Sequence, residues 1–279
     1  MARRPVEDVA ARTFLRLAYA LDRRSRKKDG TRLVPWDLDP VRLPPLKTWA
    51  EIEESHRLLE RETRGLLRGF RREWLVDHLP ALRALISLVK GRVPPLPEQA
   101  RSFYGLSPRE AREEELEALR SQVRRLLPVS REDGLRESVE TWEREQRVSR
   151  ERVLPTMSRY LVEAQKGARK MFDLPRQEVV NLVGVRNART SGYCEYTHDY
   201  RSTVKLNVSL PWSHTALRDM AAHEAYPGHH VHQATREWEY LHGDFPREAA
   251  VSMAADPMGP VEEGIGENGM AFIHWDRSR

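Results

Sequence analysis

The segment HEAYPGHHVH, residues 223–232, contains four histidines and one glutamate. It begins like the H-E-x-x-H motif, in which two histidines four residues apart bind zinc and the glutamate activates water. A proline, Pro227, stands where the second histidine belongs, and the next histidines are His229 and His230. These residue types predict a metal site with an altered spacing.

An unbroken helix cannot bring these histidines to one ion. His229 would lie about 120° around the axis from His223, and His230 about 10.5 Å along it. Pro227 lacks the N–H that would bond back to His223, and Gly228 tolerates almost any backbone conformation. We therefore predict a bulge that loops out two residues and brings His229 to the second ligand position. His230 is the alternative second ligand.

A third ligand is expected from DPMGPVEEGIGENGMAF, residues 256–272, where Pro260 can begin a helix. That helix carries Glu262, Glu263 and Glu267, of which the last two share a face. Many zinc peptidases take a glutamate from a later helix and leave one coordination position for water. We expect Glu263 to be the ligand and Glu267 to hydrogen-bond a ligand histidine.

The elements that position these residues are expected to be mainly α-helical. Residues 1–150 read as an arginine- and glutamate-rich helical region, and residues 151–279 as a region resembling metallopeptidases. Apolar spacing and proline positions predict helices over 6–24, from 48 to about 74, over 107–127 with Ser107 as cap, and over 135–172, with irregular joints at 34–46 and 93–100.

The segment 179–210 is richer in Val, Thr, Tyr and Gly. VKLNVSL (204–210) alternates as a strand, and SGYCEY (191–196) can pair with it as a hairpin. Ser213 is expected to cap a helix that starts near His214 and carries the first ligand near its end. The edge of the hairpin is suited to holding an extended peptide by main-chain hydrogen bonds.

Composition narrows the classes of function. The 47 basic and 42 acidic residues are interleaved, so nucleic-acid binding is not expected, although the run RRSRKK (23–28) keeps it as a weaker alternative. No apolar run approaches the roughly 20 residues that span a bilayer. Cys194 is the only cysteine, which predicts a packing role rather than a nucleophile and a cytoplasmic location.

Together, HEAYPGHH, the preceding strand KLNVSL and the later EEGIGENG resemble the bacterial domain-of-unknown-function family 885, whose members are treated as zinc metallopeptidases related to the gluzincins. The similarity runs from about Leu154, through FDLPRQEVV, to Phe272. It implies a largely helical, gluzincin-like fold, in which a multi-helix bundle has a small β hairpin beside the metal-binding helices.

The resemblance also implies residue roles. His223, His229 and Glu263 would hold one Zn²⁺, and Glu224 would be the general base in hydrolysis of a peptide substrate. Gly266 stands where the family has a small residue or alanine.

Family members extend beyond the position that corresponds to Arg279, so the oxyanion-stabilising group is sought within the chain. Tyr193, Tyr196 or His198 could fill this role. Residues that could support the ligands or face the substrate are these three together with His230, His232, Glu267 and Asn207. The alternative function is that of a catalytically inactive zinc-binding or interaction protein.

Overall fold

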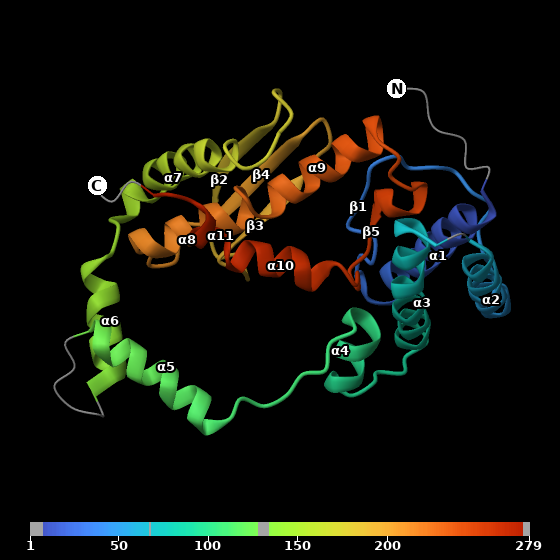
Figure 1. The fold of residues 1–279 in the computed structure, drawn as a ribbon, viewed down its shortest axis with the longest axis horizontal. Helices are drawn as coiled ribbons and strands as arrows, with labels where there is room; N and C mark the ends of the chain where they lie inside the picture. The colour runs from blue at the N-terminus through green and yellow to red at the C-terminus, as the bar shows by residue number, and fades with distance from the viewer. Residues whose placement is uncertain (1–7, 67, 128–133, 276–279) are drawn as a thin grey trace. The chain divides into compact units, whose positions relative to one another are not determined.

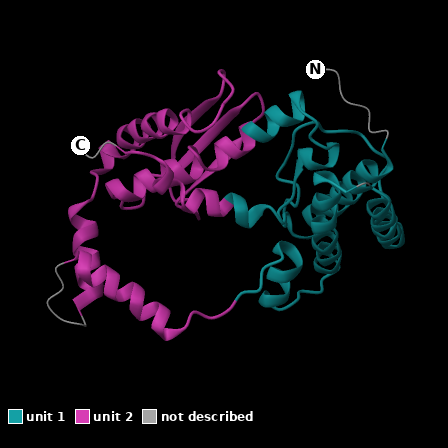
Figure 2. Cartoon of the chain, viewed as in Figure 1, with its two compact units in different colours: residues 1–108, 235–262 teal, residues 109–234, 263–279 magenta. Residues whose placement is uncertain are grey.

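The computed structural model describes residues 8–66, 68–127 and 134–275. This described part of the chain is mainly helical (59%) and contains two small sheets, which confirms the predicted fold class (Figure 1). It divides into two compact units, residues 1–108 with 235–262 and residues 109–234 with 263–279 (Figure 2). The second unit begins at residue 109, and the segment 235–262 returns to the first unit. The functional regions 1–150 and 151–279 stay a prediction from the sequence.

The first unit is built on helices that pack around an apolar core. Its elements are α1 (Val9–Asp29), β1 (Trp36–Asp37), α2 (Trp49–Gly65), α3 (Phe70–Val89), α4 (Leu96–Tyr104), the later part of α9 (His229–His242), η3 (Arg247–Ala250), β5 (Val251–Ser252) and the start of α10 (Gly259–Glu267). Phe14, Leu17 and Leu21 repeat along α1 at helical spacing and are fully buried. Strand β5 pairs antiparallel with β1. The segment 235–262 thereby contributes buried core residues and one β-strand to this unit.

The basic run 23–28 forms the last turns of α1, where cations complement the helix dipole. Arg24 donates to the carbonyls of Leu46 and Lys47, at 3.2 and 2.6 Å. Arg26 pairs with Asp22 at 2.8 Å. At least these two arginines therefore have a structural use within the unit.

Several predicted helix boundaries were wrong. The helix expected from residue 48 to about 74 is two helices, because Leu66 is extended and Gly69 has φ +150°. Helix α4 begins inside the predicted joint 93–100. The helix expected over 107–127 begins only at Glu113. The Glu115 carboxylate accepts the backbone N–H of Arg112, the residue just before this helix.

The second unit combines helices with a three-stranded sheet. Its elements are α5 (Glu113–Leu126), α6 (Leu135–Glu145), η2 (Arg150–Arg152), α7 (Val153–Ala168), β2 (Val179–Val185), β3 (Gly192–Tyr196), β4 (Arg201–Asn207), α8 (His214–Glu224), the start of α9, the end of α10 and α11 (Gly269–Phe272). The predicted helical stretch 135–172 is thus α6 and α7 with a short 3₁₀ turn between them.

The sheet of the second unit has the order β2-β4-β3. Strand β3 runs antiparallel to β4, with Tyr193 opposite Lys205, so the predicted hairpin is confirmed. Strand β2 pairs with β4 in parallel, a contact that was not predicted. Val204 and Leu206 of β4 are fully buried in the core of this unit. This core supports the two helices that carry the histidines.

Within the described residues, no helix is both long and apolar enough to span a membrane.

Candidate metal centre

Helix α8 places the first histidine at its C-terminal end. The Ser213 hydroxyl accepts the N–H of Ala216 at 3.1 Å, so the predicted cap is confirmed. Leu217 and Ala221 are fully buried and fix one face of the helix to the core. His223 and Glu224 are the last two residues of this anchored helix.

A widened turn separates α8 from α9. The Gly228 N–H donates to the carbonyl of Ala222 at 2.9 Å, and the Val231 N–H donates to that of Ala225 at 3.3 Å. Each bond spans six residues instead of the four of a regular helix. The turn therefore absorbs two extra residues, as predicted, and the intervening Tyr226–Pro227 peptide bond is cis.

Gly228 is required by a close backbone approach within this turn. A Cβ at this position would lie 1.8 Å from the carbonyl oxygen of His223 and 2.6 Å from that of Ala222. No side chain fits there, because both neighbours are main-chain atoms.

The turn brings the three predicted ligands together. His223 Nε2 lies 3.4 Å from one carboxylate oxygen of Glu263, and His229 Nε2 lies 3.6 Å from the other. One ligand atom from each of the three residues lies within 4.8 Å of the others. Four tetrahedral Zn²⁺ bonds of about 2.0–2.2 Å place ligand atoms about 3.3–3.6 Å apart. Each histidine lies at about this distance from one of the two Glu263 oxygens, while the group with one atom from each residue spans up to 4.8 Å. Two imidazoles and one carboxylate are also a donor set that zinc favours.

The glutamates of α10 face different partners. Glu267 Oε1 lies 3.8 Å from His223 Nδ1, the ring nitrogen that does not face Glu263. Glu262 lies 3.8 Å from the buried guanidinium of Arg236 and is itself largely buried. Only Glu263 among these three faces both histidines. The predicted hydrogen bond between Glu267 and a ligand histidine is not formed, because 3.8 Å exceeds hydrogen-bond distance.

Glu224 is 7% exposed, immediately after the first ligand. Burial raises the pKa of its carboxyl group, and the nearby Glu263 raises it further. The charge of His223 and a hydrogen bond from the Cys194 backbone oppose this rise without cancelling it. A carboxylate with a raised pKa is a better proton acceptor near neutral pH.

The bond to Cys194 places Glu224 against the outer edge of β3. Asn207 N–H bonds to the carbonyl of Ser191, and Thr197 N–H bonds to that of Arg201, so alternate residues of β3 face β4. The backbone groups of the intervening residues, Gly192, Cys194 and Tyr196, therefore point away from β4. Burial raises the pKa of the Cys194 thiol to about 12, which agrees with a packing role.

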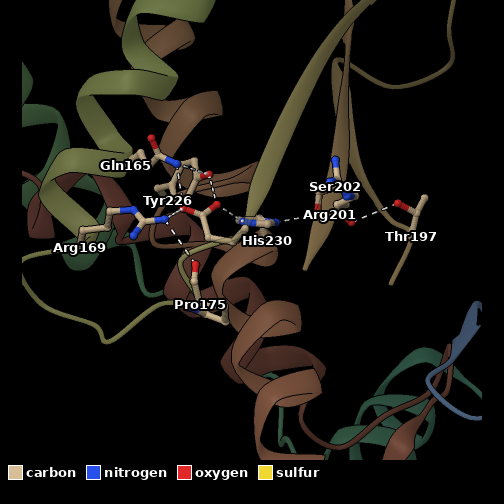
Figure 3. A network of polar contacts seen from close by, with 9 residues as sticks. Gln165, Arg169, Pro175, Thr197, Arg201, Ser202, Tyr226 and His230 are labelled. Carbon is tan, nitrogen blue, oxygen red and sulfur yellow. Dashed lines mark hydrogen bonds and ion pairs between the residues drawn. The ribbon is translucent and has the colours of Figure 1, made fainter. Parts of the chain in front are cut away.

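Two of the predicted candidates lie in the protein interior. His230 is fully buried, with Nδ1 2.8 Å from the Ser202 hydroxyl and Nε2 3.0 Å from Glu178 (Figure 3). Asn207 donates to the carbonyls of Ala188 and Thr190, at 3.1 and 3.3 Å, and so ties down the loop before β3. The structure thus places neither residue in the metal group.

The remaining candidates surround the hairpin and α9. Tyr193 is 41% exposed and has the Lys205 ammonium 5.2 Å from its ring. The Tyr196 ring lies 6.3 Å from that of His230, and His198 has φ +65° in the turn after β3. His232 is half-buried on α9. Among the described residues, the metal group comprises only His223, His229 and Glu263.

Two carboxylates near the site were not singled out from the sequence. Asp219 lies one turn before His223 on α8, and burial together with Glu267 raises its pKa. Glu178 precedes β2 and binds His230. A helical spacing of four residues could have indicated Asp219, but no local signal indicates Glu178.

Comparisons of this chain with family models, with curated proteins and with solved structures find no match. The candidate metal centre therefore stands on the geometry of His223, His229 and Glu263 and on the chemistry of their donor atoms.

Proposed function

We propose that the chain is a zinc-dependent hydrolase that cleaves peptide bonds. The observation that carries this proposal is the convergence of His223, His229 and Glu263 across a widened helical turn, with buried Glu224 beside the first ligand. Membership of domain-of-unknown-function family 885 and a cytoplasmic location remain predictions from the sequence.

The chemistry divides between the ion and the side chains. A zinc ion held by the three ligands supplies a Lewis acid that polarises a carbonyl and makes water more acidic. Glu224 accepts the proton of the attacking water and returns it to the leaving amine, a role that its raised pKa favours. Glu267 lies 3.8 Å from Nδ1 of His223, so its negative charge favours the orientation in which Nε2 faces Glu263.

The outer edge of β3 supports a peptide as the substrate. Gly192 and Tyr196 point their backbone groups in the same direction as Cys194, whose backbone meets Glu224. An extended peptide that adds to this edge by main-chain hydrogen bonds would pass beside the proposed base. Such binding does not depend on the side chains of the substrate.

Zinc content tests the ligand assignment. We expect one zinc per wild-type chain and none in His223→Ala or His229→Ala after dialysis, measured by elemental analysis. His242→Ala is the matched control, since His242 lies on the same helix α9 but stacks on Trp238. Full zinc retention in His223→Ala would refute the site.

Cleavage of a peptide library tests the mechanism. Glu224→Gln should keep its zinc and lose activity by about 10²–10⁴-fold, because the amide cannot accept the proton. Activity equal to wild type would eliminate Glu224 as the base. Stoichiometric zinc with no cleavage by the wild type would instead support the catalytically inactive zinc-binding protein.

A further inference from the structure

One buried carboxylate binds a residue inside the widened turn and a residue at the start of α9. Glu178 lies directly before β2, and its side chain has no solvent exposure. Its Oε2 accepts the Tyr226 hydroxyl at 2.6 Å and contacts His230 Nε2 at 3.0 Å (Figure 3). Tyr226 immediately precedes Pro227–Gly228, and His230 immediately follows the ligand His229. A single oxygen therefore spans the turn that sets the ligand spacing.

The other oxygen of Glu178 is fixed to α7. Gln165 Nε2 donates to Oε1 at 2.7 Å, and Arg169 donates to the same oxygen at 2.5 Å. Gln165 also donates to the Tyr226 hydroxyl at 3.2 Å. The carboxylate is thus also held by residues at the end of α7, a helix that does not contribute a ligand.

The charge of Glu178 strengthens these bonds. Burial would raise the pKa of its carboxyl group, but hydrogen bonds from His230, Tyr226, Gln165 and Arg169 outweigh burial and lower the pKa to about 2. The group is therefore ionised at neutral pH. Hydrogen bonds to an ionised acceptor are roughly twice as strong as bonds between neutral groups.

We propose that Glu178 is a positioning residue that sets the separation of His223 and His229 by fixing the widened turn, at Tyr226, to the start of α9, at His230. It touches neither the metal ligands' donor atoms nor the edge of β3, and it acts through Tyr226 and His230. The turn needs such support because its six-residue hydrogen bonds leave it two residues longer than a helical turn. The role in metal binding rests on the proposed function, but the effect on the turn does not.

Two variants remove the bonds at Oε2 with little change of shape. Glu178→Gln can keep an oxygen toward Arg169, and its amide nitrogen then replaces the oxygen that binds Tyr226 and His230. Tyr226→Phe removes only the hydroxyl. Ser202→Ala is the matched control, because it deletes the bond at the other nitrogen of His230 and leaves the contacts at Glu178 intact.

Amide hydrogen exchange in the metal-free protein tests the effect on the turn. We expect the amides of Gly228 and Val231 to exchange at least about tenfold faster in Glu178→Gln, and less so in Tyr226→Phe, because the turn opens more often. Ser202→Ala should match the wild type at both amides. Equal exchange in all four proteins would overturn the proposal.

Metal affinity tests the consequence for the ligands. Competition with a chromophoric chelator should show zinc bound about 10–100-fold more weakly by Glu178→Gln, the usual cost of losing a group that orients ligands. The visible absorption of bound Co²⁺ should change in Glu178→Gln and not in Ser202→Ala. A lower melting temperature with unchanged exchange and affinity would show that Glu178 only stabilises the fold.

The two proposals fail in different ways. A wild type that binds no zinc would refute the metal centre, and the exchange rates would still decide whether Glu178 holds the turn. A wild type that binds zinc, with Glu178→Gln binding it equally well, would refute only the positioning role.

Discussion

Gly266 lies against the ring of the first ligand histidine. A Cβ at this position would stand 2.8 Å from His223 Nδ1 and 3.0 Å from Cγ and Cε1. The contact explains why a residue without a side chain suits the helix that also carries Glu263. At Gly264, two residues earlier, a Cβ would meet nothing within 4 Å.

These two glycines allow a matched test on one helix. Gly266→Ala should displace the His223 ring and weaken zinc binding by about tenfold or more, within the range for a perturbed ligand environment. Gly264→Ala should leave the affinity unchanged and stabilise α10 by about 0.5–1 kcal/mol, because alanine favours helix. Zinc affinities from chelator competition check the first expectation, and urea unfolding checks the second. Equal affinity in both variants would contradict the close contact.

Glu178 should also make the free energy of unfolding depend on pH. Its folded pKa of about 2 lies below the ordinary value of 4.5, so its ionisation stabilises the folded state above pH 4.5. That stabilisation is lost as the pH falls from 4.5 toward 2. Glu178→Gln should therefore be less stable than wild type at pH 7, by up to on the order of 3 kcal/mol, with a smaller difference at pH 3. Urea unfolding at the two pH values measures this, and a constant difference would contradict it.

At the scale of elements, the junction of α8 and α9 depends on Gly228. Gly228→Ala would press a Cβ onto the carbonyls of His223 and Ala222, and main-chain atoms cannot rotate away. We expect loss of stoichiometric zinc and a destabilisation of at least about 3 kcal/mol, measured by elemental analysis and urea unfolding. Gly65→Ala is the control, since a Cβ at Gly65 meets nothing within 4 Å. Wild-type zinc content in Gly228→Ala would refute the described turn.

The elements that could be predicted from the sequence have local causes. The widened turn follows from Pro227 and Gly228, which act on their own backbone, and the hairpin follows from alternation beside a short turn. His223, Glu224 and His229 are within this local pattern. Glu263 required a second local signal, the start of α10 at Pro260.

The features that could not be predicted depend on distant partners or on a single backbone angle. The parallel pairing of β2 with β4 could not be predicted from a turn motif, because β3 lies between these two strands in the sequence and no short turn joins them. Glu178 acquires its role from His230 and Tyr226, far along the chain. The break between α2 and α3 was missed because Leu66 and Phe70 keep a helical spacing while the backbone turns at Gly69.

At the scale of the whole molecule, all three proposed ligands belong to the second unit. Zinc should therefore protect the amides of this unit from hydrogen exchange more than those of the first unit, since a ligand stabilises the folded state that binds it. Adding zinc is expected to slow amide exchange most in α8 and the start of α9, and to slow it less in α2 and α3 of the first unit. Hydrogen-exchange mass spectrometry measures both regions. Equal protection of α2 and α3 would contradict a local effect.

The segment 235–262 lies between the second and third ligands in the sequence, and it belongs to the first unit. There Val251 and Met253 are buried in a core that shares no residue with the metal centre. If this segment were unfolded, His229 and Glu263 would be joined by a flexible loop, and closing that loop around an ion would cost entropy. Folding of the first unit removes that cost before an ion arrives. If zinc binds as proposed, the core of the first unit is therefore expected to favour metal binding through chain connectivity.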